Sequence, residues 1–243
     1  SLTSIETDDV SLLFKFFDGF FLYGFFLAFA EEDLFDWFDP QKRNTSKRDF
    51  EWYEALWKRL AVSANQDRVI PKLFSLSTNI PAFQTHFPDS KILYMVRDPL
   101  NVLPSGLSLV TGVLDKRFGF WSLDENIRER FIKRLYNAFV ELLKRFHEDW
   151  TNGSIDKTKV FIVKYDRIMT DFDELMNEIL TFTGITPTDE MMIEIKNTAD
   201  RQRQYTSAHK YNLEKFGLNE DQIRSDCSFI YDTFLNSVNN EVD

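Results

Sequence analysis

The stretch KILYMVRDPLNVLPSGLSL, residues 91–109, decides the fold. It opens with a short apolar run, residues 91–96, of the kind that forms a parallel strand covered on both faces. Arg97 and Asp98 follow the run, and Pro99 then begins a helical pattern. In open parallel sheets, ligands bind at the carboxyl ends of the strands. We therefore expect Arg97 to lie at the ligand-binding edge of a parallel sheet.

Apolar runs and helical patterns alternate along the rest of the chain. Residues 68–75 and 159–165 are two further expected strands. Helical patterns predict helices in segments 50–64, 78–87, 122–150 (which opens with a capping pattern at Ser122), 170–185, 189–198 and 219–236. This order predicts an α/β fold of three layers, a parallel sheet flanked by helices, in residues 68–243. Residues 1–67 are expected to form an N-terminal helical region, rich in Phe, that acts as a lid or packing region.

The composition limits the partners. The 243 residues carry a formal net charge of −10, which argues against broad binding to nucleic acid or anionic lipid. A bound anion must therefore be held by individually placed residues. The one cysteine, Cys227, cannot form an intramolecular disulfide, and the three histidines are too scattered for a metal cluster, so no metal is expected. The chain begins at Ser1 rather than Met, and we expect a processed or truncated product.

Residues 12–30, LLFKFFDGFFLYGFFLAFA, are nearly long enough to span a membrane. Lys15 and Asp18 interrupt the segment, and each charge would cost roughly 2.5–3.5 kcal/mol at the centre of a bilayer. A very hydrophobic core or lid helix, with a partner subunit as one packing surface, therefore fits better than a membrane span. Contact with a partner chain or a membrane through this segment stays open.

Arg97 and Ser105 suit an anion site. Arginine has a planar fork of donors that matches phosphate. Ser105 follows eight residues later, about two turns into the expected helix, where its hydroxyl can face the same crevice. Asp98 and Pro99 shape the turn between strand and helix. The alternative is an ordinary ion pair between Arg97 and a carboxylate, because such pairs are common at protein surfaces.

The same segment, extended to FPDSKILYMVRDPLNVLPSGLSL, resembles the 3′-phosphate-binding segment of sulfotransferases that use 3′-phosphoadenosine 5′-phosphosulfate (PAPS). In that family an arginine at the strand end and a serine eight residues later hold the 3′-phosphate, and they match Arg97 and Ser105. Three further stretches are similar in the same order: RVIPKLFS (68–75), VFIVKYDRIMTDFDELMNEILTFTGI (160–185) and YTSAHKYNLEKFGLNEDQI (205–223). The last is similar to the C-terminal segment of the membrane-type and bacterial branches. The resemblance implies the P-loop-like architecture of sulfotransferases.

The resemblance also implies roles for individual residues. Lys72 matches the catalytic lysine, which neutralises the leaving 5′-phosphate or the sulfuryl oxygens. Tyr165 matches a tyrosine near the adenine and the 3′-phosphate of PAPS or of its product, 3′-phosphoadenosine 5′-phosphate (PAP). Basic residues expected in a C-terminal loop would close over the phosphates: Arg201, Arg203, His209 and Lys210. For Lys72 an exposed turn is the alternative, and for the two arginines a solvated surface.

Two parts of the family pattern are not found. A glycine-containing loop of the PRSGTT or PKSGTTW type should cradle the 5′-phosphosulfate, and residues 1–75 contain no such loop. The first strand and its loop are therefore expected to be absent from this chain, through truncation or through degeneration. The general base is also open. Phe74 replaces the histidine that follows the lysine in many relatives, and the remaining candidates are weak: Glu31, Glu32 and His86.

The function expected from the resemblance is transfer of a sulfuryl group from PAPS to a hydroxyl or an amine. A degenerate, structural subunit of a larger complex, membrane-associated or not, is the alternative. A P-loop kinase is disfavoured because neither a GKS/T motif nor a metal-binding aspartate after a strand is visible. The aromatic-rich residues 14–38 would suit a hydrophobic acceptor or a lipid. The compartment stays open between the Golgi, another membrane-associated compartment and the bacterial cytoplasm.

Overall fold

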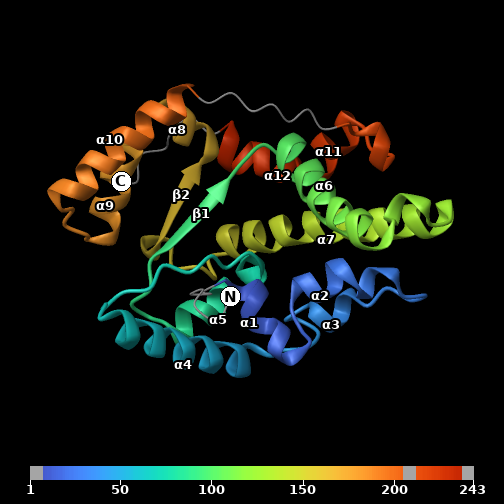
Figure 1. Ribbon diagram of the computed structural model, residues 1–243, viewed down its shortest axis with the longest axis horizontal. Coiled ribbons are helices and arrows are strands. Elements are labelled where there is room, and N and C mark those ends of the chain that lie inside the picture. Colours follow the sequence, from blue (N-terminus) through green and yellow to red (C-terminus); the bar gives the residue numbers. More distant parts are fainter. Residues whose placement is uncertain (1–7, 205–211, 237–243) are drawn as a thin grey trace. The chain divides into compact units, whose positions relative to one another are not determined.

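The computed structural model describes residues 8–204 and 212–236. These residues are mostly helical and contain one sheet of two parallel strands (Figure 1). Contacts divide the chain into two compact units, Ser1–Pro88 with Ser105–Ile155 and Asp89–Pro104 with Asp156–Asp243. The expected parallel sheet is therefore present, but it is smaller than the sequence indicates. The expected boundary between residues 67 and 68 stays a prediction.

In its described residues, the first unit is built from helices. The longer elements are α4 (Ser46–Ala64), α5 (Ile80–His86), most of α6 (Pro99–Phe118) and α7 (Glu125–Thr151). The shorter ones are α1 (Asp9–Leu13), α2 (Phe20–Phe25), α3 (Phe35–Phe38) and 3₁₀ turns at Phe14–Phe16, Leu27–Phe29, Ser75–Thr78 and Phe120–Ser122.

The Phe-rich residues 12–30 form a series of short helices, so the expected single helix is wrong. The chain is interrupted where its backbone is left-handed, at Phe17 (φ 48°) and Gly19 (φ 88°). Only glycine adopts the second conformation without strain, and a Cβ there would also approach Leu13 Cδ1 to 2.9 Å. Across the described part of the chain, no helix combines the length and the apolar character that crossing a bilayer requires.

Helix α7 provides the central surface of the first unit's core. Its buried side chains recur at helical spacing: Phe131, Ile132, Leu135, Tyr136, Ala138, Phe139, Leu142 and Phe146. The rings of Phe29 and Phe131 stack with centroids 4.2 Å apart, and those of Phe20 and Phe139 are 5.4 Å apart. Each fully buried Phe contributes about 1.5–3 kcal/mol. The Phe-rich segment therefore forms core with α7.

The start of α7 differs from the expected one. The sequence places a capping residue at Ser122, but the helix begins at Glu125 after Asp124, which forms no side-chain cap. Residues 120–122 form a separate 3₁₀ turn instead, because Gly119 turns the chain with φ 67°. The Ser122 hydroxyl donates to the Gly119 carbonyl at 2.7 Å and is thus part of that turn.

Residues 68–75 do not form the expected strand. They are irregular and lead into the 3₁₀ turn at Ser75–Thr78. Pro71 has no N–H to donate to a strand ladder. The N–H groups of Phe74 and Ser75 donate to the buried carboxylate of Asp9 at 3.0 and 2.7 Å. These two backbone donors are bound to a side chain and are not available to a strand ladder.

The second unit contains the sheet and the C-terminal helices. Its elements are β1 (Ile92–Val96), the start of α6, β2 (Val160–Lys164), α8 (Tyr165–Thr170), α9 (Phe172–Thr183), α10 (Asp189–Gln204), α11 (Glu220–Asp226), α12 (Ser228–Ile230) and a π-helical turn at Tyr231–Leu235. The expected helix at 170–185 is confirmed as α9, which ends at Gly184 (φ 67°). The expected helix at 189–198 continues to Gln204. The expected single helix at 219–236 is divided into three segments.

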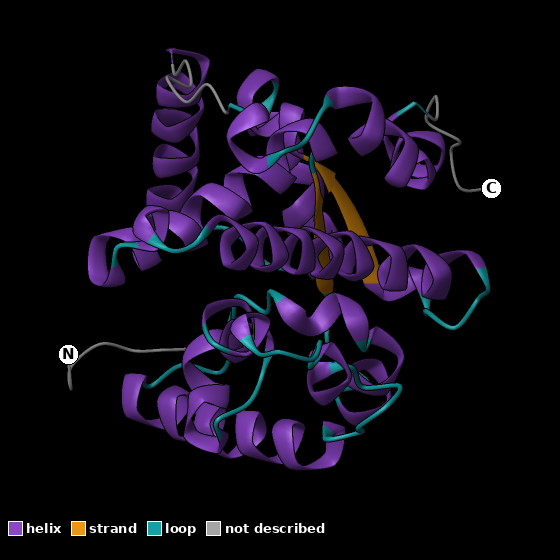
Figure 2. Ribbon diagram, turned by 90° about the vertical axis from the view of Figure 1, so that its right-hand side faces the viewer, coloured by secondary structure: helices purple, strands orange, loops and turns teal. Residues whose placement is uncertain are grey.

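The two strands lie side by side and parallel, with Ile92 paired to Val160 and Val96 to Lys164 (Figure 2). Burial alternates along β1, and the side chains of Leu93 and Met95 are 37 and 52% exposed. The expectation that β1 is covered on both faces is therefore wrong for the described residues. An apolar run of five residues cannot distinguish a strand covered on both faces from one with an open face.

Candidate functional site

The ends of β1 and β2 bring two sequence-predicted residues together. Because Val96 is paired with Lys164, the next residues, Arg97 and Tyr165, leave the sheet at the same edge. The guanidinium carbon of Arg97 lies over the Tyr165 ring, 4.3 Å from its centroid. Such a cation–π contact holds the guanidinium plane in place while its N–H groups can still donate elsewhere.

Arg97 is half-buried, and among the described residues no carboxylate forms an ion pair with it. Its neighbour Asp98 accepts instead from the Leu100 N–H at 2.9 Å and from the Tyr231 hydroxyl at 2.6 Å. An ordinary ion pair was the alternative expected for Arg97, and the described residues do not provide it. The strand end therefore holds a guanidinium fork that lies over an aromatic ring, and among the described residues no carboxylate pairs with it.

Ser105 lies on α6, six residues after Pro99, and begins the second stretch of the first unit, Ser105–Ile155. Its side chain is half-buried. Helix α6 carries Pro104 in its interior, immediately before Ser105. A proline at that position removes one helical hydrogen bond. The expected position of Ser105, about two turns into the helix, is confirmed; its role stays a prediction.

Lys72 lies in the irregular segment before Ser75–Thr78 and belongs to the first unit. Its side chain is 86% exposed, and Nζ lies 3.1 Å from the Asp8 carboxylate. The Lys72 carbonyl accepts from the Asp9 N–H at 3.3 Å. Since no strand precedes it among the described residues, the expectation that Lys72 is carried by a strand is wrong.

Arg201 and Arg203 lie in the last turn of α10, so their expected place in a loop is wrong. Arg201 donates to Glu194 at 2.6 Å, and Arg203 binds Asp173 at 2.7 Å and Asp200 at 2.9 Å. The hydrogen bond from Arg203 lowers the pKa of Asp173. Both arginines are therefore engaged on the protein surface in this structure. His209 and Lys210 lie outside the described residues.

The structure shows the surroundings of Phe74 and of two candidates for the general base, Glu31 and His86. Phe74 packs its ring 5.5 Å from that of Phe20, and Glu31 is almost fully exposed, with Arg130 3.4 Å away. His86 lies against the Phe50 ring at 5.7 Å and 3.4 Å from the Glu54 carboxylate. These contacts suit solvated or packing roles, and the identity of a general base stays open.

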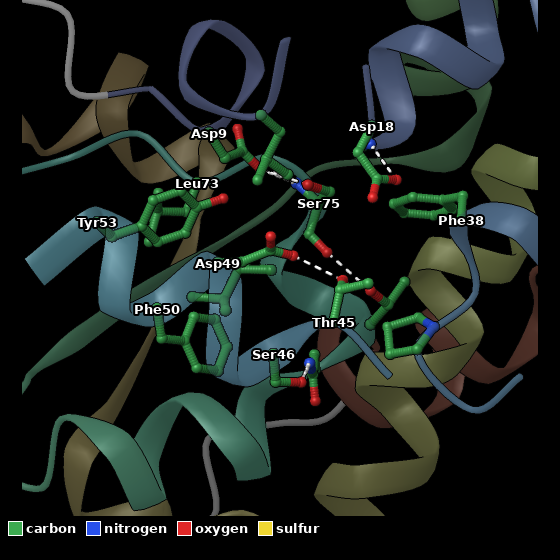
Figure 3. Close-up of a pocket in the computed structure, with 16 residues that line it drawn as sticks. Asp9, Asp18, Phe38, Thr45, Ser46, Asp49, Phe50, Tyr53, Leu73 and Ser75 are labelled. Atoms are coloured by element: carbon green, nitrogen blue, oxygen red, sulfur yellow. Dashed lines mark hydrogen bonds between the residues drawn. The ribbon is translucent and has the colours of Figure 1, made fainter. Parts of the chain in front are cut away.

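The sequence did not indicate a small pocket in the first unit (Figure 3). Its cavity of about 50 Å³ is lined by three buried aspartates, Asp9, Asp18 and Asp49, and by side-chain hydroxyls. The Asp18 carboxylate accepts from Arg43 and, at 2.7 Å, from Arg48. Burial opposes ionisation of Asp18, but the two arginines outweigh it and lower its pKa.

Asp49 titrates in the opposite direction. Burial raises its pKa, although Thr45 donates to it at 2.7 Å and Arg48 from Nε at 2.7 Å. Because the carboxylates already have donors, we interpret this pocket as a polar junction between α1, α4 and residues 72–75. No local motif predicts it, since its members come from segments about 65 residues apart.

The sequence matches the model of the sulfotransferase family over residues 28–190, well over half of the chain. The chain belongs to this family. Among curated proteins, no sequence matches it. Its fold is similar to that of the sulfotransferase STF9 from Mycobacterium avium, with a TM-score of 0.68 and 18% sequence identity. The similarity covers 85% of this chain and 51% of STF9, so the chain spans about half the length of that protein.

Proposed function

We propose that this sulfotransferase-family chain binds the 3′-phosphate of PAPS or PAP with Arg97. The observation that carries the proposal is the position of Arg97 at the carboxyl end of β1, stacked on Tyr165 at the end of β2. A half-buried guanidinium without a carboxylate partner in the described part of the chain is suited to a doubly charged phosphate. Family membership supports the choice of PAPS among phosphate ligands.

The chain's own residues would divide the work. Arg97 would hold the 3′-phosphate, Tyr165 would support the guanidinium and the nucleotide, and the Ser105 hydroxyl would add a donor. Lys72 would leave Asp8 and neutralise the charge that develops on the leaving 5′-phosphate. PAPS, when bound, supplies the sulfuryl group. The proposed reaction is transfer of that group to a hydroxyl or an amine.

Calorimetric titration with PAP tests this proposal. The wild-type chain should bind PAP, and Arg97→Ala should bind it about 10–100-fold more weakly, because a charge-assisted hydrogen bond contributes roughly 1.5–3 kcal/mol. Arg117→Ala is the matched control, since Arg117 is an exposed arginine at the end of α6. Equal affinities of wild type and Arg97→Ala for PAP would refute the assignment.

A structural subunit without catalytic activity is the second candidate function. Lys72 is turned to solvent and paired with Asp8, and Phe74, at the place of a possible base, is packed among aromatic rings. Both observations favour a chain that has kept the nucleotide site and lost the reaction. Binding of PAP without sulfuryl transfer from PAPS to phenols, alcohols or amines would support this candidate.

A further inference from the structure

The hydroxyl of Tyr231 connects the end of the described chain to the strand-end turn. It donates to Oδ1 of Asp98 over 2.6 Å, across 133 residues of sequence and within the second unit. Tyr231 is half-buried and is the first residue of the π-helical turn at Tyr231–Leu235. Such turns are rare and occur frequently at functional sites. No sequence motif identifies this tyrosine as a functional residue.

Asp98 is the residue that this hydrogen bond holds. The same Oδ1 accepts from the Leu100 N–H at 2.9 Å, and the Asp98 carbonyl accepts from the N–H groups of Asn101 and Val102. Asp98 therefore acts as the N-cap of α6. Its carboxylate is directed at the helix start, although it belongs to the residue next to Arg97.

The direction of this carboxylate matters for anion binding. A carboxylate released from the cap would be one residue away from the Arg97 guanidinium and could pair with it, in competition with a phosphate. Tyr231 opposes that release with a short hydrogen bond to a charged acceptor. Burial and the neighbouring Asp98 raise the pKa of the Tyr231 hydroxyl, so it remains a donor throughout the neutral range.

We propose that Tyr231 is a positioning residue of the anion site: it keeps the Asp98 carboxylate on the helix cap and so leaves Arg97 available for phosphate. This inference rests on the proposed function of Arg97. Tyr231 acts through Asp98 and, in the proposal, does not touch the nucleotide. A second guanidinium, that of Arg224, lies 5.6 Å from the centroid of the Tyr231 ring and adds positive charge beside the turn.

The test compares PAP with 5′-AMP, which lacks the 3′-phosphate, by calorimetric titration. Tyr231→Phe removes only the hydroxyl and should weaken PAP binding about ten-fold, with no change for 5′-AMP. In an Arg97→Ala background, Tyr231→Phe should cause no further loss. Adding Asp98→Asn to Tyr231→Phe should restore PAP binding, because a released amide carries no charge to compete with the phosphate.

Tyr23→Phe is the matched control. The Tyr23 hydroxyl also donates to an aspartate, Asp33, at 2.8 Å, but in the first unit. It should lower thermal stability and leave PAP affinity unchanged. A loss in Tyr23→Phe equal to that in Tyr231→Phe would overturn the inference, since stability alone would then explain both.

The remaining outcomes separate the two proposals. If wild type binds PAP and Arg97→Ala does not, but Tyr231→Phe binds normally or is not rescued by Asp98→Asn, only the role of Tyr231 is refuted. If wild type does not bind PAP, the proposed function fails and the inference with it. If Tyr231→Phe does not fold, the PAP affinity of the single variant Asp98→Asn is measured instead. An affinity at or above that of wild type supports the inference, and a weaker affinity overturns it.

Discussion

At the scale of single residues, the pH response of the buried aspartates depends on what surrounds each carboxylate. Asp18 and Asp49 share the donor Arg48 and line one cavity, yet their pKa values are shifted in opposite directions. Asp18 has two arginines and the N–H of Gly19, which outweigh burial. For Asp49, burial dominates. Two buried aspartates that line the same cavity can therefore have pKa values shifted in opposite directions.

Asp18→Asn tests this difference through stability. The folded pKa of Asp18 is depressed, so its contribution is complete above the unfolded value of about 3.9 and is lost as pH falls through the lower, folded value. We expect Asp18→Asn to lose about 2 kcal/mol of unfolding free energy at pH 7 and progressively less below pH of about 4. Urea denaturation at several pH values measures it, and a loss that stays constant down to pH of about 2 would contradict the pKa shift.

Asp49→Asn is the matched comparison. Because the folded pKa of Asp49 is raised, its protonated form favours folding below the unfolded pKa, and this contribution is lost as pH rises through the folded value. The stability of Asp49→Asn relative to wild type should therefore improve from low to neutral pH, the reverse of the trend for Asp18→Asn.

At the scale of elements, α7 holds the Phe-rich segment by polar contacts as well as by its apolar face. Arg134 donates from Nη1 to the carbonyls of Ala28 and Ala30 at 3.2 and 2.5 Å, and from Nη2 to that of Glu31 at 2.9 Å. Arg130 donates to the Phe29 carbonyl at 3.2 Å. The short helices of this segment leave carbonyls without helical partners, and the arginines of α7 satisfy them.

Arg134→Ala should therefore lower the free energy of unfolding by about 2–3 kcal/mol, because it leaves carbonyls beside the fully buried Ala28 without donors. Chemical denaturation monitored by tryptophan fluorescence measures the loss. Lys133→Ala, on the same helix at an exposed position, is the control and should change stability by less than about 0.5 kcal/mol. A loss no larger than that of the control would show that the carbonyls find other partners.

The elements also show where sequence reasoning succeeds. The strands β1 and β2, the helix α9 and its end at Gly184 follow from local apolar patterns and from one residue that adopts positive φ, so they could be predicted. The strand expected at 68–75 does not form, and the N–H groups of Phe74 and Ser75 at its end donate to Asp9, about 65 residues earlier. The hydrogen bond between Tyr231 and Asp98 could not be predicted for the same reason: no local pattern records a partner 133 residues away.

At the scale of the whole molecule, binding to anions must be local. The formal net charge of −10 repels polyanions, and the basic residues Arg201 and Arg203 are neutralised by neighbouring carboxylates. Arg97 differs from them because, among the described residues, it has an aromatic partner and no acidic one. The family match over residues 28–190 includes this arginine and its neighbour in space, Tyr165.

The chain should therefore discriminate a nucleotide from a nucleic acid. On immobilised double-stranded DNA at about 0.1 M salt we expect no retention, since non-specific binding depends on many cationic contacts with phosphate. PAP binding, measured in the same buffer, should persist. Retention on DNA that Arg97→Ala does not affect would mean that a second cationic surface exists.

The parallel pairing of β1 with β2 also bears on how the chain folds. Ile92 meets Val160, so the whole of α6 and α7 lies within the loop that this contact closes. Contacts between such distant residues incur their entropic cost before they yield any stabilisation, whereas a helix such as α7 gains its hydrogen bonds turn by turn. We expect α7 to form early and the strand pairing late. The sheet edge that carries Arg97 and Tyr165 would then be one of the last parts of the molecule to fold. A chain arrested during folding would contain helices but no binding site.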